Sequence, residues 1–204
     1  MRIIAGRFGS RPLASPAGLA TRPTSDRLRE TLFNVLAPRI EGAVFLDLYS
    51  GSGAVGIEAL SRGAAQVAFV ERAPAALKVL RANLARLGIA GEAGIHAASA
   101  GTFLRRPPAA PLQNFSLVFL DPPYDAAAEY AATLGLLGGA AAATLAPNAL
   151  VVAEHRRKQP LEDRYGALER IRIIEQGDAA LSYYASSTLP ARPSQLARPG
   201  QSHE

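Results

Sequence analysis

The stretch that decides the fold is Val44–Gly56, V-F-L-D-L-Y-S-G-S-G-A-V-G, a hydrophobic strand sequence that runs into a glycine-rich turn and then a helix. Residues 51–56 match the pattern G-x-G-x-x-G, in which glycines allow a tight turn and a close approach of the backbone to a nucleotide. Glu71, at the end of the next predicted strand, is the acid that would bind ribose hydroxyls. This pattern alone fits a nicotinamide-dependent dehydrogenase as well as an enzyme that uses S-adenosylmethionine (SAM).

Asp47 discriminates between these two cofactors. It lies four positions before Gly51, near the end of the first predicted strand. A carboxylate there suits a cofactor with a cationic amino-acid moiety and would face the pyrophosphate of a dinucleotide unfavourably. SAM carries an ammonium and a sulfonium group, so the sequence favours SAM.

A second stretch, residues 115–124, has the residue types expected of a catalytic or binding site. The apolar run Phe115–Leu120 predicts a buried parallel strand, and Asp121-Pro122-Pro123-Tyr124 follows it directly. The two prolines stiffen the chain, because each fixes its own φ and holds the preceding residue extended. An acid, carbonyls and an aromatic ring would then lie at the carboxyl edge of the sheet, where open α/β sheets bind ligands. A plain proline-stiffened loop is the alternative, but the glycine-rich turn predicted beside it favours a site.

The alternation of strands and helices from residue 44 onward predicts an α/β fold. We expect a doubly wound, mostly parallel, seven-stranded sheet with an antiparallel last strand. The predicted strands cover residues 44–49, 66–71, 94–97, 115–120, 150–154, 168–175 and 179–185. The predicted helices cover residues 53–62, 74–87, about 99–104 and, as one broken helix or two, 126–145, with 105–111 and 155–165 as loops. An earlier helix should follow the cap residue Ser25 and end at Pro38.

Composition limits the class of protein. The chain has 204 residues, of which 49% are hydrophobic, with no cysteine and three scattered histidines. These numbers predict one well-buried domain, no disulfide, no metal site and a cytoplasmic protein that does not enter a membrane. We expect an N-terminal arm and helix at 1–40 that forms an RNA-binding appendage, the main domain at 41–185, and a disordered tail at 186–204.

The charge of the chain indicates a polyanionic partner. The net charge is +5, and arginine supplies nearly all of the positive charge. Arginine binds phosphate well because its planar group donates two hydrogen bonds at once. The candidate nucleic-acid contacts lie in the arm and in the first helical turn: Arg2, Arg7, Arg11, Arg22, Arg27 and Arg29. An arginine-rich coding bias would explain the same composition without RNA.

Taken together, these motifs resemble a known family. Asp47–Gly56, Glu71 and Asp121–Tyr124 are similar to the cofactor and catalytic motifs of Rossmann-like class I SAM-dependent methyltransferases. The block Arg22-Pro23-Thr24 with Arg29–Asn34, together with Gly56–Gly63, resembles the RsmD family more closely. That family methylates the exocyclic N2 of a guanine in bacterial small-subunit (16S) ribosomal RNA.

The resemblance implies a role for each matching residue. Its cofactor-binding set here is Asp47, Tyr49, Gly51, Ser52, Gly53, Glu71, Arg72 and Ser99, where Asp47 and the glycines hold the methionine part of SAM and Glu71 its ribose. Its catalytic set is Asp121, Pro122, Pro123 and Tyr124. Asp121 and the Pro122 carbonyl would accept the amino hydrogens of guanine, and Tyr124 would stack on the base. Ser99 stands where the family often has an acid or amide near the adenine, and Tyr49 where phenylalanine is commoner.

Other targets fit part of the pattern. Asp-Pro-Pro-Tyr also occurs in adenine-N6 DNA methyltransferases and resembles the Asn-Pro-Pro-Tyr of glutamine-N5 protein methyltransferases. The basic arm argues against a protein target, and the short chain lacks room for a DNA target-recognition domain. A dehydrogenase or a non-catalytic RNA-binding module remains as a further alternative. We expect a monomer that acts on 16S ribosomal RNA, either naked or within an assembling small subunit.

Overall fold

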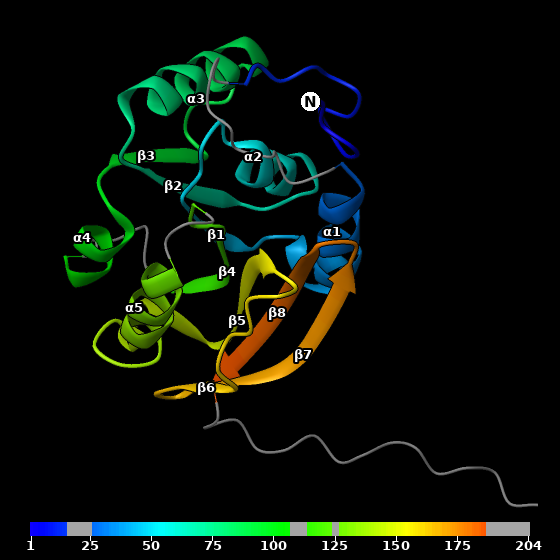
Figure 1. Ribbon diagram of the computed structural model, residues 1–204. Helices are drawn as coiled ribbons and strands as arrows, with labels where there is room; N and C mark the ends of the chain where they lie inside the picture. Colours follow the sequence, from blue (N-terminus) through cyan, green and yellow to red (C-terminus); the bar gives the residue numbers. More distant parts are fainter. Residues whose placement is uncertain (16–25, 107–113, 124–126, 187–204) are drawn as a thin grey trace, which may run out of the picture.

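The computed structural model describes residues 1–15, 26–106, 114–123 and 127–186. Within these residues, eight strands form one sheet in the order β3-β2-β1-β4-β5-β8-β7-β6 (Figure 1). The strands are β1 (Val44–Leu48), β2 (Gln66–Glu71), β3 (Ala93–Ala97), β4 (Phe115–Leu120), β5 (Leu145–Arg156), β6 (Arg164–Tyr165), β7 (Leu168–Gln176) and β8 (Ala179–Ser186). The helices are α1 (Asp26–Ile40), α2 (Ala54–Ser61), α3 (Pro74–Leu87), α4 (Ala100–Arg105), α5 (Ala127–Leu137) and the 3-10 turn η1 (Ala142–Thr144).

The sheet is mostly parallel, as the sequence predicted. Strands β1 to β5 pair in parallel, and β8 runs antiparallel between β5 and β7. This confirms the α/β class and the antiparallel last strand. Seven strands match the predicted ones, and the eighth, β6, has two residues in a stretch that we expected to be a loop. The predicted tail beyond Ser186 and most of the predicted loop 105–111 lie outside the described residues.

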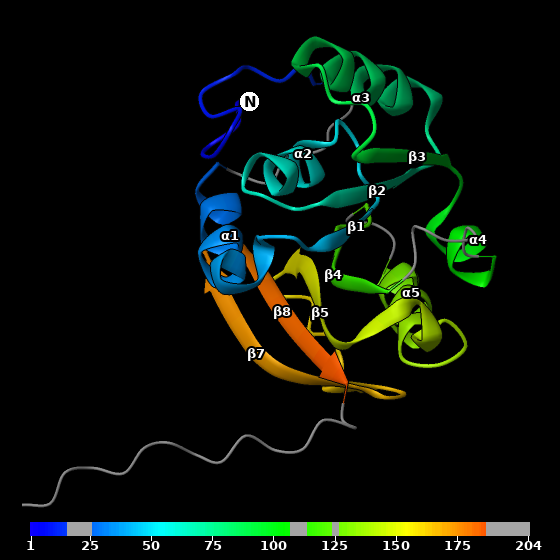
Figure 2. The ribbon, with the colours of Figure 1, turned by 180° about the vertical axis from the view of Figure 1, so that it is seen from behind.

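Helices cover both faces of the sheet. Figures 1 and 2 show α1, α2 and α3 on one face and α4 and α5 on the other. Each layer encloses its own apolar cluster: Leu32, Ile57, Leu80 and Phe45 belong to the first, and Phe103, Leu134 and Leu46 to the second. Successive strand residues therefore face opposite layers. Among the described helices, none has the length and apolar composition that a membrane span requires.

Two predicted boundaries were wrong. Helix α1 continues through Pro38 to Ile40. A proline removes one helical N–H and crowds the carbonyl four residues earlier, here that of Asn34. Both residues are exposed, so water reaches that carbonyl and the last turn tolerates the proline. Strand β5 runs from Leu145 to Arg156, well beyond the predicted residues 150–154.

The N-terminal arm is packed onto the domain. Its two ends meet in an antiparallel bridge between Arg2 and Pro12, so the arm folds back on itself as a hairpin. Ile3, Phe8 and Leu13 are buried in the same cluster as α1, α2 and α3. The arm therefore contributes to the hydrophobic core.

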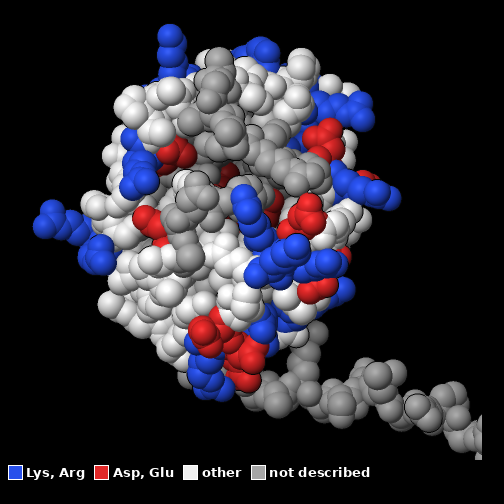
Figure 3. Space-filling model, viewed as in Figure 1, with Lys and Arg blue, Asp and Glu red and all other residues white. Residues whose placement is uncertain are grey.

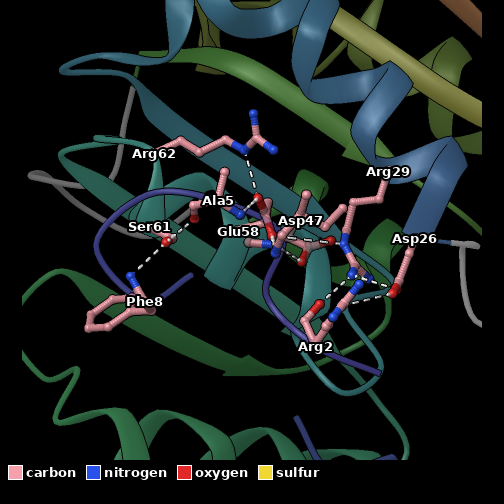
Figure 4. A network of polar contacts seen from close by, with 11 residues as sticks. Arg2, Ala5, Phe8, Asp26, Arg29, Asp47, Glu58, Ser61 and Arg62 are labelled. Atoms are coloured by element: carbon pink, nitrogen blue, oxygen red, sulfur yellow. Dashed lines mark hydrogen bonds and ion pairs between the residues drawn. The ribbon is translucent and has the colours of Figure 1, made fainter. Parts of the chain in front are cut away.

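A buried charge network holds the arm in place (Figure 4). The Glu58 carboxylate of α2 accepts hydrogen bonds from the amides of Ile4 and Ala5 at 2.7 and 3.0 Å and from Arg62 Nε at 2.6 Å. Arg29 Nε lies 4.0 Å from the same carboxylate. Arg29 Nη2 donates to the carbonyl of Arg2 and to Asp26. One acid thus connects the arm, α1 and α2.

This network predicts a large loss of stability for Glu58→Gln. The substitution keeps the shape of the side chain but removes the buried negative charge that accepts hydrogen bonds from Ile4, Ala5 and Arg62 and lies near Arg29. Breaking a buried charge network in this way typically costs about 3 kcal/mol or more. Urea denaturation followed by circular dichroism measures the free energy of unfolding. The control is Arg7→Gln, which breaks the half-exposed pair of Arg7 with Glu92 and should cost less than about 1 kcal/mol. Equal, small losses in both variants would contradict the role of Glu58.

Candidate active site

Four acids gather at the carboxyl edge of the sheet. Because β1, β2, β4 and β5 run in the same direction, their carboxyl ends share one edge. Asp47 lies near the end of β1, Glu71 ends β2, Asp121 follows β4, and Glu154 lies near the end of β5. The structure therefore brings together Asp47, Glu71 and Asp121, which the sequence predicted as site residues.

The strand register places three of these acids on the same face of the sheet. Asp47 pairs with Phe119, and Leu120 pairs with Ala153, so Asp121 and Glu154 are neighbours on adjacent strands. Phe119 belongs to the cluster under α1 to α3, and alternation puts Asp47, Asp121 and Glu154 on that side. Asp47 is 2% exposed and Glu154 is 1% exposed.

Burial and neighbouring charges raise the pKa values of two of these acids, Asp47 and Asp121. Burial raises the pKa of Asp47 to about 7, and the charge of Glu71 adds to the effect, while a hydrogen bond from the Gly56 amide opposes it. The pKa of Asp121 is raised well above its usual value, first by burial of its carboxyl group and then by the charges of Glu154 and Asp47. Raised carboxyl pKa values of this kind are common at functional sites.

Glu154 is a residue that the sequence analysis missed. It ends the predicted strand 150–154 in the same way that Glu71 ends the second strand. The position of Glu154 at the end of a predicted strand was the available sequence signal. The sequence did not show that this strand pairs with β4, so it could not show that Glu154 lies beside Asp121.

The glycine-rich turn is held by Glu71. Its Oε2 accepts the amide of Gly51 at 2.9 Å, and its Oε1 accepts the amides of Arg72 and Ala73 at 2.8 and 2.7 Å. Gly51 and Gly53 have φ values of +56° and +82°, a region that favours glycine. A Cβ atom at Gly53 would come within 2.3 Å of Leu80, so α3 can pack closely only against glycine there.

Two residues predicted to contact the cofactor, Tyr49 and Ser99, form side-chain hydrogen bonds within the protein. The Tyr49 hydroxyl lies 2.7 Å from both Glu129 Oε2 and Thr133 Oγ1 of α5, so it joins the turn to that helix. The Ser99 hydroxyl caps α4 by accepting the Thr102 amide at 3.1 Å and lies 2.9 Å from Thr102 Oγ1. Both hydroxyls are thus engaged by protein partners. Ser52 is nearly buried in the turn, and Arg72 is exposed beside Glu71.

The catalytic segment is described as far as Pro123. Asp121 is partly exposed, Pro122 is buried and Pro123 is exposed. Tyr124, and with it the predicted stacking ring, lies outside the described residues, as do Arg22 and the cap residue Ser25.

The predicted nucleic-acid contacts divide into two groups. Arg2, Arg7, Arg11 and Arg27 are exposed, which leaves them accessible to a ligand. Arg29 is 0% exposed, and its guanidinium lies in the network with Glu58 and Asp26 (Figure 4). The prediction that Arg29 contacts RNA is therefore wrong: a buried charge needs its counter-charges, and Arg29 supports the fold.

The electrostatics of the edge fit SAM. Within the part of the chain that the structure describes, no Lys or Arg side chain forms an ion pair with Asp47, Glu71 or Asp121. An edge that concentrates negative charge attracts cations and repels a pyrophosphate. SAM presents an ammonium and a sulfonium, whereas a nicotinamide dinucleotide presents two phosphates.

The fold and this edge define a Rossmann-like class I methyltransferase. A family model described as "Conserved hypothetical protein 95" matches residues 1–185. The chain belongs to this family, which is the RsmD family that its motifs resemble.

Named relatives and a solved structure agree with this membership. The chain is 40% identical over 163 residues to "Ribosomal RNA small subunit methyltransferase D" of Haemophilus influenzae, covering 79% of this chain and 81% of the relative. It is 44% identical over 124 residues to the protein of the same name from Escherichia coli K12, covering 61% and 60%. A structure described as "Putative methyltransferase yhhF from Escherichia coli" superposes with a TM-score of 0.79 at 35% identity, over 93% of this chain and 99% of that one.

The raised pKa of Asp47 predicts a pH-dependent stability that Asp47→Asn removes. Because folding raises this pKa from 3.8 to about 7, the folded state binds the proton more tightly, and the stabilisation is lost as pH rises from about 4 to about 7. Above pH 7 the asparagine variant should be more stable than the wild type by on the order of 4 kcal/mol, given about 1.4 kcal/mol per pKa unit for a rise from 3.8 to about 7. Urea titrations between pH 4 and 8 measure this difference, and parallel curves for the two proteins would contradict it.

Proposed function

We propose that the protein transfers the methyl group of SAM to the exocyclic N2 of a guanine in the 16S RNA of the bacterial small ribosomal subunit. The observation that carries this proposal is the edge of the sheet where Asp47 and Glu71 flank the glycine-rich turn after β1. Asp121-Pro122-Pro123 follows β4, the strand that pairs directly with β1. Membership of the RsmD family and the names of the relatives support an RNA target.

The cofactor end of the site is built from β1 and β2. When bound there, SAM supplies an electrophilic methyl group on a sulfonium. The Asp47 carboxylate, once ionised, binds the ammonium group, and the turn at Gly51 and Gly53 leaves room for the methionine part. Glu71 binds the ribose hydroxyls, exchanging some of its backbone hydrogen bonds for them.

The target end of the site is built from the segment after β4. The N2 lone pair of guanine is delocalised into the ring, so the nitrogen must be held in line with the methyl group rather than strongly activated. Asp121 and the carbonyl of Pro122 accept the two amino hydrogens and set that orientation. Tyr124 stacks on the base after it has turned out of its RNA context.

The proton balance of the reaction also involves Asp121. As the C–N bond forms and the C–S bond breaks, N2 becomes positively charged and releases one proton. The Asp121 carboxylate is the nearest acceptor, and its raised pKa makes it a better base than an ordinary aspartate. The proton then passes to water, and the enzyme returns to its starting state.

The choice of guanine N2 rests on the RsmD resemblance. Adenine N6 and glutamine N5 would need the same acceptors, since each target is also an amino group. The exposed arginines favour a nucleic acid over a protein. We further propose that the protein acts as a monomer.

The proposal predicts that Asp121→Asn keeps the fold and the SAM affinity but lowers methyl transfer by about 100-fold or more, because the amide loses the charge that holds the amino group and accepts its proton. The assay is mass spectrometry of 16S RNA from a deletion strain that carries the wild type or the variant. The control is Glu169→Gln, an exposed acid on β7. N2-methylguanine that does not depend on the wild-type gene would overturn the proposed target, and normal turnover by Asp121→Asn would remove Asp121 from the mechanism.

A further inference from the structure

Three consecutive cations follow the strand that carries Glu154. Arg156 ends β5, and Arg157 and Lys158 form the turn after it. All three residues are exposed. Lys and Arg side chains gather beside the ends of β5 and β7 and the start of β8 on the face shown in Figure 3. From the sequence alone this stretch was only a polar loop.

The turn lies close to the catalytic segment. Asp121 neighbours Glu154 by register, and Arg157 is three residues further along. At roughly 3.3 Å per residue, the turn begins about 10 Å from Asp121. Because β5 is parallel to β4, it lies at the same carboxyl edge.

The start of α1 extends this basic surface. Thr31 Oγ1 donates to Gln176 Oε1 at the end of β7, at 3.0 Å, so the first turns of α1 lie beside the β7–β8 turn. Arg27 is exposed in the first turn of that helix. Arg27 and the turn at Arg157 are thus at the same edge, although they are far apart in the sequence.

Two arm arginines, Arg7 and Arg11, lie elsewhere, whereas Arg2 Nε lies 3.8 Å from Asp26 Oδ2 at the start of α1. The Arg7 amide donates to the carbonyl of Ser61, the last residue of α2, and its guanidinium pairs with Glu92, just before β3. Both partners mark the amino edge of the sheet, about 15 Å from the carboxyl edge for a five-residue strand such as β3. Arg7 and Arg11 also lie over the Phe8 ring, at 4.2 and 5.7 Å. They are poorly placed to hold RNA whose base reaches Asp121.

The acids near the turn leave its cations accessible. Arg157 Nη1 lies 4.0 Å from Glu175 Oε2, and both side chains are about half exposed, at 51% and 53%. An exposed pair at this distance is weak, so a phosphate can displace the carboxylate. Asp178 also lies on the neighbouring turn, where its carbonyl accepts the Arg157 amide.

We propose that Arg157 and Lys158, together with Arg27, bind backbone phosphates of the RNA strand that flanks the target nucleotide. This proposal rests on the proposed function, since it supplies the RNA contact of the same site. The sequence predicted the N-terminal arm as the main RNA-binding surface. The proposal instead assigns this role to the turn after β5 and the first turn of α1. Phosphate is the chemical group recognised, so these contacts are independent of base sequence.

The test measures RNA binding without methylation. The double variant Arg157→Gln/Lys158→Gln is compared with Arg7→Gln/Arg11→Gln, which removes the same charge from the arm. Each protein is titrated with single-stranded poly(U) in a series of KCl concentrations. Losing two phosphate contacts should flatten the slope of log affinity against log salt by about 1.4 and weaken binding about 20-fold near 0.1 M salt. The arm variant should keep the wild-type slope, and both variants should keep the wild-type SAM affinity.

Two results would overturn the proposal: an unchanged slope in the turn variant, or a loss confined to the arm variant. Absence of poly(U) binding by the wild type would also overturn it. Mass spectrometry of 16S RNA remains a separate readout, because a protein that binds poly(U) through the turn but adds no N2-methylguanine would contradict the proposed function alone.

Discussion

The parallel pairing of β1, β2, β4 and β5 is the constraint on which the site depends. Because these strands run in one direction, each delivers its carboxyl end to the same edge, and with it Asp47, Glu71, Asp121 and Glu154. Burial disfavours ionisation of Asp47 and Asp121, and the negative charges of the neighbouring acids add to that effect. The raised pKa values of Asp47 and Asp121 record this cost of ionisation, which a cationic ligand would relieve.

The buried carboxylate of Glu58 fixes the arm and α1 to α2. Glu58 accepts amides of the arm and the guanidinium of Arg62, the residue after α2, and it lies near Arg29 of α1. Ile3 and Phe8 fill the core beneath. The arm is therefore needed for the stability of the domain. Removing it would test folding as much as RNA binding, which is why single surface charges are the better probes.

The sequence predicted the fold well because its local signals agree. Pro74 opens α3, and Gly88 closes it in the left-handed conformation, so both boundaries were correct. The glycine-rich turn and the acids Asp47 and Asp121 also met at one edge as expected, because strand order in doubly wound sheets is regular. The predicted end of α1 at Pro38 was wrong because an exposed last turn tolerates a proline.

The rest of the site could not be read from the sequence because it depends on neighbours that are distant in the chain. Glu154 became a site residue only through its register beside Asp121. Arg29 looked like a phosphate ligand, but Glu58 and Asp26 bury it. The Tyr49 hydroxyl is oriented toward α5 because the turn has a φ of +63° there, which no spacing rule indicates.

The central claim is that the buried Asp47, whose pKa burial raises to about 7, becomes the anionic partner of a cationic cofactor. Calorimetric titration with SAM at pH 6, repeated in buffers of different ionisation enthalpy, measures the protons exchanged on binding. The account predicts release of close to one proton by the wild type and none by Asp47→Asn, with no binding of NAD by either. Binding of NAD in place of SAM, or SAM binding with no proton release from the wild type, would contradict it.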